Sequence, residues 1–252
     1  MLILYHSGMG YVPWGWHVKN NELSEAFIAP MQFLNRWRLP LLFFISGCGV
    51  AFSLRRRSLG EFRSERLRRL GLPILAGIFF IVPPQIYFER LAQGATFSYA
   101  EFYPSVFQFV PYPKGSTSWH HLWFVVYVLV YALVTIPLYE HLRRFAAMFS
   151  DWVSISPWRI YLVTLPNLFV GMTLGPKFPT THALFGDWAN LLGAWLTFCW
   201  GFVFASNEKL LDLVQRRRVE FLYAGIAATA LFFTTKGFGR ELAAATWASR
   251  GS

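Results

Sequence analysis

Charged residues are scarce in this chain of 252 residues. Asp, Glu, Lys and Arg make up 14% of it, whereas a typical soluble domain carries about a quarter. Cysteine is scarce too, because only Cys48 and Cys199 are present and both lie inside apolar segments. Two such cysteines provide neither a disulfide framework nor a set of thiolate metal ligands. We therefore expect no structural zinc site and no small disulfide-stapled fold.

Several common catalytic patterns are also missing. The sequence has no P-loop, no HExxH, no GxSxG and no pair of carboxylates at a catalytic spacing. It gives no support for a P-loop nucleotidase, a zincin or a hydrolase with a nucleophile elbow. The first residues, Met1–His6, lack the basic region of a secretory signal peptide. We expect no metal and no redox cofactor.

Apolar residues dominate what is present. The chain is 55% hydrophobic and 19% aromatic, with a mean hydropathy of +0.37. A spanning helix needs about 20 mainly apolar residues, and the sequence predicts an all-α, polytopic transmembrane bundle. About six complete spans are expected, at Arg38–Leu54, Leu70–Phe88, His121–Tyr139, Trp158–Leu174, Trp188–Ser206 and Val219–Thr235.

Basic residues gather between two of these spans. The segment Arg55–Arg69 reads RRRSLGEFRSERLRR, with seven Arg and two Glu, and its charge of +5 is half of the chain's +10. Lys and Arg are retained on the cytoplasmic side of membranes, so we expect this loop to be cytoplasmic. Because the cations sit at the ends of apolar runs, they indicate a lipid bilayer and not nucleic acid as the partner.

The charge of the loops alternates along the chain. Residues 89–118 carry no net charge, the connection Glu140–Pro157 carries Arg143 and Arg144 near the membrane, and residues 207–218 end in three arginines. This alternation is what the positive-inside rule requires. The first apolar run is too short to span, so we expect a partial first helix. We expect one membrane domain over residues 1–252, incomplete at the N-terminus and also at the C-terminus.

His6 is the first candidate for chemistry. It lies in the segment LILYHSGMG, at the outer part of the partial helix. A histidine at membrane depth is uncommon and is a functional candidate by default, and near neutral pH it can act as a general base. The alternative is an interfacial histidine bonded to a backbone carbonyl.

A pair of arginines closes the basic loop. Arg66 and Arg69 are three residues apart, with Pro73 a little further on. If the helix of the following span begins inside the loop, both guanidinium groups share one face and could clamp phosphates. The alternative is that they are topology charges, since Arg55, Arg56 and Arg57 would anchor the loop equally well.

Two histidines open the span after the neutral loop. The segment WHHLWF places His120, His121 and Trp123 at the outer interface. These side chains could hold a sugar ring by stacking and hydrogen bonding. The alternative is an aromatic belt with polar neighbours.

Taken in order, four segments resemble the acyltransferase type 3 family of integral membrane acyltransferases. They are LYHSGMGYVPW, FLNRWRLPLLFFISG, RSERLRRLGLPILAGIFFIVPPQIYFERL and SWHHLWFVVYVLVY, within residues 2–137. The resemblance implies transfer of an acyl group from cytoplasmic acyl-CoA to a hydroxyl of a carbohydrate or glucan at the outer face. It also implies that His6 is catalytic and that Arg66 and Arg69 bind the phosphates of the donor.

This resemblance leads to specific expectations and leaves two rivals open. The partners are acyl-CoA as co-substrate, a carbohydrate or glucan acceptor and the lipid bilayer, and the location is the bacterial cytoplasmic membrane. Because a thioester is already activated, no other cofactor is expected. The rivals are a glycan or lipid transporter of flippase type without catalysis, and an inactive remnant.

Overall fold

The structure is a computed structural model that describes the backbone of residues 2–14 and 20–248. Side chains are described in residues 3–14 and 20–235. The chain divides into two compact units, 1–207 and 208–252, and each is treated by itself.

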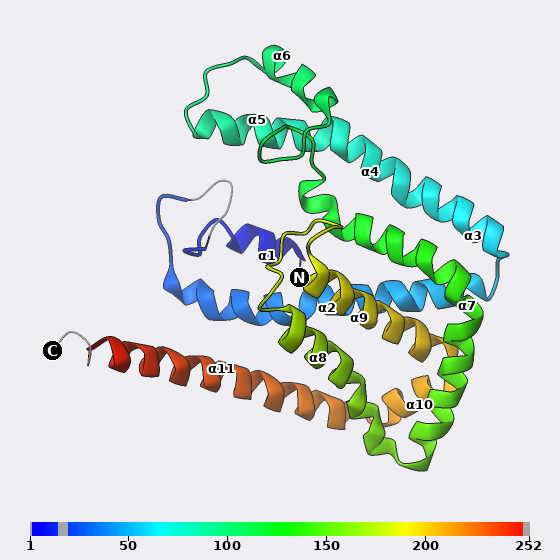
Figure 1. Ribbon diagram of the computed structural model, residues 1–252. Helices are drawn as coiled ribbons and strands as arrows, with labels where there is room; N and C mark the ends of the chain where they lie inside the picture. The colour runs from blue at the N-terminus through cyan, green and yellow to red at the C-terminus, as the bar shows by residue number, and fades with distance from the viewer. Residues whose placement is uncertain (1, 15–19, 249–252) are drawn as a thin grey trace. The chain divides into compact units, whose positions relative to one another are not determined.

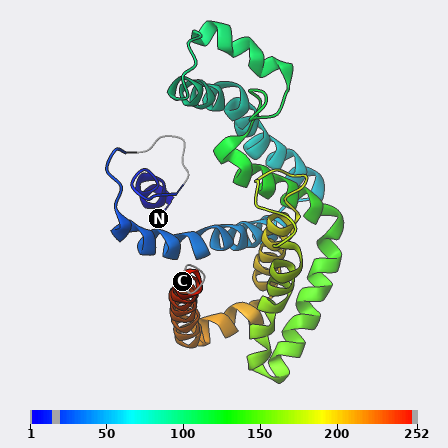
Figure 2. The ribbon, with the colours of Figure 1, turned by 60° about the vertical axis from the view of Figure 1, so that its left-hand side comes forward.

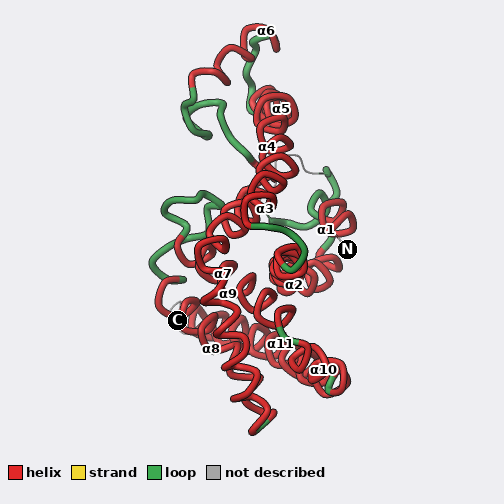
Figure 3. The backbone as a smooth tube through the Cα atoms, turned by 90° about the vertical axis from the view of Figure 1, so that its right-hand side faces the viewer, coloured by secondary structure: helices red, strands yellow, loops and turns green. Residues whose placement is uncertain are grey.

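Helices account for almost all of the regular structure, as Figure 3 shows. The first unit contains α1 (Leu2–Gly8), α2 (Ile28–Leu54), α3 (Leu59–Arg66), α4 (Leu72–Ala76), α5 (Val82–Ala92), α6 (Tyr99–Phe102), α7 (Trp123–Ile155), α8 (Thr164–Leu174) and α9 (Trp188–Ser206). The second contains α10 (Glu208–Arg216) and α11 (Arg218–Ala248). Within the described residues, β pairing is limited to an isolated bridge between Pro111 and Thr117. The all-α prediction is confirmed.

Four helical stretches are long and apolar enough to cross a membrane. They are Glu25–Leu54, Leu59–Ala92, His120–Ile155 and Trp188–Ser206, and they contain four of the six predicted spans. The protein is therefore described as an integral membrane protein with four candidate spans among the described residues. The predicted total of six is not confirmed.

The remaining two predicted spans have different outcomes. Trp158–Leu174 is not one α-helix, because its first part lies in the 3₁₀ segment Pro157–Val163 and α8 follows with 11 residues. Eleven α-helical residues are too few for a hydrocarbon core of about 30 Å. Val219–Thr235 lies inside α11, whose side chains are described only as far as residue 235.

The boundaries of two helices differ from the prediction. α2 begins ten residues earlier than Arg38, at Ile28. The connection expected over Glu140–Pro157 is instead mostly helical, because α7 continues to Ile155. A pair three residues apart, Arg143 and Glu140 with N···O of 3.8 Å, lies on this extension. Polar residues at helical spacing let a helix continue beyond its apolar part, so hydropathy alone placed the end too early.

The helix of the basic loop begins where its capping residues allow. Ser58 accepts a hydrogen bond from the Glu61 backbone N–H, and the Glu61 carboxylate accepts one from the Ser58 backbone N–H at 2.9 Å. This capping box fixes the start of α3. A helix therefore does begin inside the arginine loop, which was the condition set for Arg66 and Arg69 to share one face. Figures 1 and 2 show α3, α4 and α5 following one another as a nearly continuous rod.

Two π-helical turns interrupt this rod. They cover Leu67–Gly71 and Gly77–Ile81, and Pro73 and Pro83 follow them closely. A proline has no N–H and its ring displaces the carbonyl four residues earlier, so the regular α-helical hydrogen bond cannot form there. Each π-helical turn lies where the regular hydrogen bonds are interrupted.

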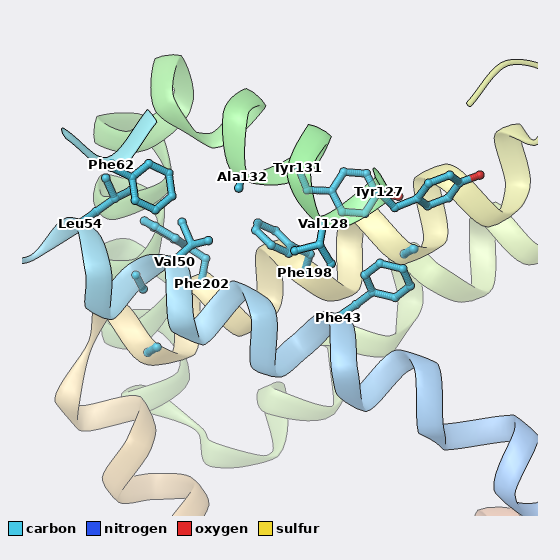
Figure 4. Packing of buried hydrophobic residues seen from close by; sticks show 13 residues of the cluster. Phe43, Val50, Leu54, Phe62, Tyr127, Val128, Tyr131, Ala132, Phe198 and Phe202 are labelled. Atoms are coloured by element: carbon cyan, nitrogen blue, oxygen red, sulfur yellow. The ribbon is translucent and has the colours of Figure 1, made fainter. Parts of the chain in front are cut away.

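The core of the first unit lies where α2, α7 and α9 pack together. Phe43, Tyr131 and Phe198 from the three helices interdigitate there, as Figure 4 shows. Helices α2 and α9 approach closely at two glycines. A Cβ at Gly47 would meet the Phe198 carbonyl, and a Cβ at Gly201 would meet the backbone of α2. Small residues permit such close packing of membrane helices.

In the second unit, α10 and α11 form a short amphipathic helix followed by a long apolar one. The turn between them carries an ion pair of 3.1 Å between Arg217 and Glu220. Leu210 is the buried side chain of α10.

Candidate functional site

The first unit has two chemically different ends. The end at which α7 and α9 begin carries His6 and His121 and is called the histidine end. The end at which α2 and α9 finish carries Arg55 and the arginine loop and is called the arginine end. α9 has 19 residues, which at 1.5 Å per residue separates the two ends by about 28 Å. Figure 1 shows α1 and α3 near opposite ends of α2.

His6 of α1 meets His121 near the start of α7. Their ring centroids are 6.1 Å apart, and the ring of Tyr5 is 5.8 Å from that of His6. Both histidines are exposed on this face of the protein. Two predicted site residues from distant parts of the sequence thus share one surface.

The two neighbouring histidines of the 3₁₀ turn His120–Leu122, just before α7, are directed differently. His120 Nδ1 lies 2.7 Å from Ser118 Oγ, and its ring is 4.8 Å from that of Tyr112. The His120 backbone has a positive φ of 38°, so the chain turns sharply between them. We conclude that His120 faces the preceding loop, whereas His121 faces His6.

An arginine that the sequence prediction did not use lies beside this pair. Arg38 is 8% exposed, and its guanidinium carbon lies 3.5 Å from the centroid of the Tyr5 ring. Its Nη2 donates to Asn35 Oδ1 at 3.1 Å. In the described part of the chain no carboxylate forms an ion pair with it, and its Nε is buried without a hydrogen-bond partner.

The loop before α9 covers the same end. The ring of His182 lies 4.2 Å from that of Trp123, and Trp119 Nε1 donates to the His182 carbonyl at 3.1 Å. Burial lowers the pKa of His182; Arg38 lowers it further while Asp187 opposes the shift. The third predicted acceptor-side residue, Trp123, therefore has His182 packed against it.

Asp187 holds this loop in place. It is fully buried, and its Oδ2 accepts hydrogen bonds from Tyr127 Oη at 3.1 Å, the His182 N–H at 2.8 Å and Asn190 Nδ2 at 2.9 Å. Its Oδ1 is buried without a partner among the described residues. A buried carboxylate with several donors fixes the groups around it, so Asp187 links α7, the loop and α9.

At the arginine end, the predicted pair Arg66 and Arg69 has two different environments. The Arg69 side chain is 72% exposed and its Nε bonds Glu65 at 3.0 Å. Arg66 is half-buried, with its guanidinium carbon 4.9 Å from the Phe62 ring centroid and its Nε buried without a partner. Arg66 ends α3, whereas Arg69 lies within the π turn Leu67–Gly71. They stay within electrostatic range of each other, so the structure keeps the two cations together but not equivalent.

Two other arginines of this loop, Arg55 and Arg57, have structural partners. Arg55 Nη2 donates to the Ala205 carbonyl near the end of α9. Arg57 pairs with Glu65 at 2.9 Å. A cavity of about 220 Å³ lies at this end and is lined by Ala51, Leu54, Arg55, Tyr139, Arg143 and Ser206.

Sequence reasoning missed Arg38, His182 and Asp187. A signal for Arg38 was present, because it stands at the edge of an apolar run, where a charge invites attention. His182 and Asp187 are isolated polar residues in a loop, and nothing in their spacing predicts that they meet Trp123 and Tyr127.

Comparison with known proteins identifies the family of this chain. A model of the acyltransferase domain family matches residues 1–248. The chain belongs to this acyltransferase family. The resemblance found in the four sequence segments is confirmed.

Curated relatives of this family member include "Glucans biosynthesis protein C" of Escherichia coli strain K12, of Escherichia coli strain SMS-3-5 and of Shigella dysenteriae serotype 1. Each is 25% identical over 145 residues, which is 56% of this chain and 36% of the relative. The aligned part of the chain thus spans about a third of the length of these relatives. No solved structure matches the chain.

Proposed function

We propose that this acyltransferase family member moves an acyl group from acyl-CoA to a hydroxyl of a carbohydrate acceptor, with a glucan as the acceptor suggested by the name of its relatives. The observation that carries the proposal is the meeting of His6 with His121 on an exposed face. Family membership supplies the reaction class.

The reaction needs a base and an activated acyl group. The acceptor oxygen bonds to the acyl carbon, and His6 takes the hydroxyl proton. The carbon–sulfur bond of the thioester breaks, and the departing thiolate takes the proton to become a thiol. His121 and Trp123 then serve the acceptor, one by hydrogen bonding and the other by stacking.

The donor needs cations, which the arginine end offers. Guanidinium groups suit phosphate because they form charge-assisted, often bidentate hydrogen bonds. We assign Arg66 and Arg69 to the donor phosphates. The distance of about 28 Å between the two ends allows two routes for the acyl group. Either the pantetheine arm enters the bundle, or a carrier or covalent intermediate carries the group.

This proposal places the arginine end at the cytoplasmic face of a bacterial inner membrane and the histidine end at the outer face. Acyl-CoA is a cytoplasmic metabolite, and Lys- and Arg-rich loops are retained inside. The acceptor would then be modified on the opposite side from the donor pool.

The test measures thiol release from acetyl-CoA by the full-length protein in lipid vesicles, together with binding of the donor. His6→Ala should lower the rate about 10²–10⁴-fold and leave donor binding intact. His6→Gln keeps size and hydrogen bonding but cannot take up the proton, so it should be nearly as impaired.

A matched control is His141→Gln, because His141 is an exposed histidine of α7 outside the histidine end. It should behave like wild type. Near-normal turnover in His6→Gln would assign His6 a structural role. A wild-type protein that moves glycan across vesicles without releasing thiol would identify a transporter instead.

A further inference from the structure

Arg38 is a buried charge that the proposed reaction has not yet used. It lies in α2, 16 residues before Leu54, so at 1.5 Å per residue it is about 24 Å from the arginine end. That depth is within the hydrocarbon core or at its far boundary. Arginines that only mark topology extend their guanidinium groups into water or lipid headgroups, but Arg38 is 8% exposed.

The partners of Arg38 do not neutralise it. They are a neutral amide, Asn35, and the face of the Tyr5 ring at 3.5 Å. No carboxylate in the described part of the chain contacts it, and its Nε–H has no hydrogen-bond partner. Burying an unpaired charge costs several kcal/mol of stability, and a purely structural role would not offset that cost.

The position of Arg38 brings its charge close to the groups proposed to react. Tyr5 precedes His6 in α1, and the Arg38 charge is close enough to act electrostatically on both His6 and His182. The cation–π contact with Tyr5 restricts where the guanidinium can point. A fixed cation in a low-dielectric site interacts strongly with nearby negative charge.

We propose that Arg38 is a further catalytic residue, whose guanidinium stabilises the oxygen anion that forms on the acyl carbonyl when the acceptor hydroxyl attacks. This inference rests on the proposed function. When the new carbon–oxygen bond forms, the carbonyl π electrons move onto oxygen, and His6 holds the proton of the acceptor. The anion then collapses, the carbon–sulfur bond breaks and the thiolate takes the proton.

The same chemistry would also bind a permanent carboxylate on the acyl group. The two negative groups that Arg38 could bind, the reaction oxyanion and a carboxylate of the acyl group, differ in how they depend on the donor. Stabilisation of the reaction oxyanion is needed for every acyl group, whereas a carboxylate subsite matters only for donors that carry a carboxylate. Acetyl-CoA and glutaryl-CoA provide the two arms.

The experiment compares thiol release from both donors, with a glucan oligosaccharide as the acceptor, in wild type, Arg38→Gln and Arg38→Lys. Loss of one preorganised oxyanion donor typically costs about 10²–10³-fold in kcat. We expect that loss in Arg38→Gln with both donors and an unchanged KM. Arg38→Lys should retain part of the activity because the charge remains.

Two further variants separate catalysis from folding. Arg36→Gln changes an exposed arginine two residues away in the same helix and should keep wild-type turnover. Arg38→Met should keep or raise the thermal stability, because it removes an unpaired buried charge. Tyr5→Leu, which removes the ring that positions the guanidinium, should lower kcat but less than Arg38→Gln.

Three results would replace or overturn the proposed role of Arg38. A loss confined to glutaryl-CoA would replace the oxyanion role with a carboxylate subsite. Wild-type kcat in Arg38→Gln with both donors would overturn any role for Arg38 in an active enzyme. A wild-type protein that binds donor but never releases thiol would refute the proposed function itself, and the role of Arg38 with it.

Discussion

The histidine end and the arginine end use polar residues in opposite ways. At the arginine end the cations are mostly exposed, and Arg57 and Arg69 share one acidic partner, Glu65. At the histidine end two charges are buried: Arg38 forms no ion pair within the described residues, and Asp187 accepts hydrogen bonds from neutral donors. Exposed charges orient the protein in the membrane and attract ligands at little cost in stability. A buried charge lowers stability and is retained where chemistry requires it.

The largest contrast to test is the side of the membrane on which each end lies. Single cysteines at Gly60 and Lys114, in a background without Cys48 and Cys199, should label from opposite sides with an impermeant thiol reagent. Both positions are exposed, whereas Ser116 is 1% exposed and would label poorly. Equal labelling of both sites from outside would contradict the topology.

Asp187 should be the residue on which the histidine end depends most for stability. In Asp187→Ala, the His182 N–H and Asn190 Nδ2 lose their acceptor, whereas the Tyr127 hydroxyl keeps the Ala183 carbonyl at 2.8 Å. Each buried unsatisfied group costs about 1–3 kcal/mol. We expect a loss of about 3 kcal/mol or more in thermal denaturation in detergent, and a smaller loss in Tyr127→Phe. Donor binding at the arginine end should change little in folded protein. Equal effects of the two substitutions would mean that Asp187 does not organise the loop.

Donor affinity should depend on Arg66 and Arg69. Alanine at either position should cost about 1.5–3 kcal/mol, or roughly tenfold or more in affinity for acyl-CoA. Arg55→Ala should weaken binding much less, because that guanidinium is bonded to the Ala205 carbonyl, although it should reduce stability. Arg68→Ala, an exposed neighbour, is the matched control in a titration of donor. If all four variants bind alike, the cations serve topology only.

The contact between α2 and α9 connects the two ends and should tolerate no side chain. Gly201→Ala places a methyl group against the backbone of α2 and should destabilise the protein by about 1–3 kcal/mol. Gly193→Ala in the same helix meets nothing within 4 Å and should be neutral or slightly stabilising. Thermal denaturation of the two variants compares them directly, and similar melting temperatures would argue against the close approach.

The smallest expected effect concerns pH at the histidine end. Burial lowers the pKa of His182 below its usual 6.5, so the unfolded state binds a proton more readily. Stability should therefore be intact above pH 6.5 and decline as the pH falls through the lowered pKa. In His182→Gln this part of the pH dependence should disappear, as measured by melting temperature between pH 5 and 8. A slope that persists unchanged would have to come from another group.

Sequence reasoning succeeded where a property is local or periodic. Apolar runs located the four stretches that are long and apolar enough to cross a membrane, and the arginine loop was singled out by its composition before the structure placed the start of α3 inside it. It failed where helices lengthen through polar residues, as α7 does to Ile155, and where Pro157–Val163 adopts a 3₁₀ conformation. Hydropathy measures transfer into lipid and is insensitive to the backbone hydrogen bonds that continue or break a helix.

The sequence by itself determined the helical membrane class, the basic loop and the family, because each depends on composition or on the order of residues. It also singled out His6 and His121 separately. Only the tertiary structure decided that these two meet, that Arg38 is buried beside Tyr5, and that Asp187 ties the loop of His182 to α7. Such contacts join residues far apart in sequence, and they depend on how α2, α7 and α9 pack around Gly47 and Gly201, which no local pattern records.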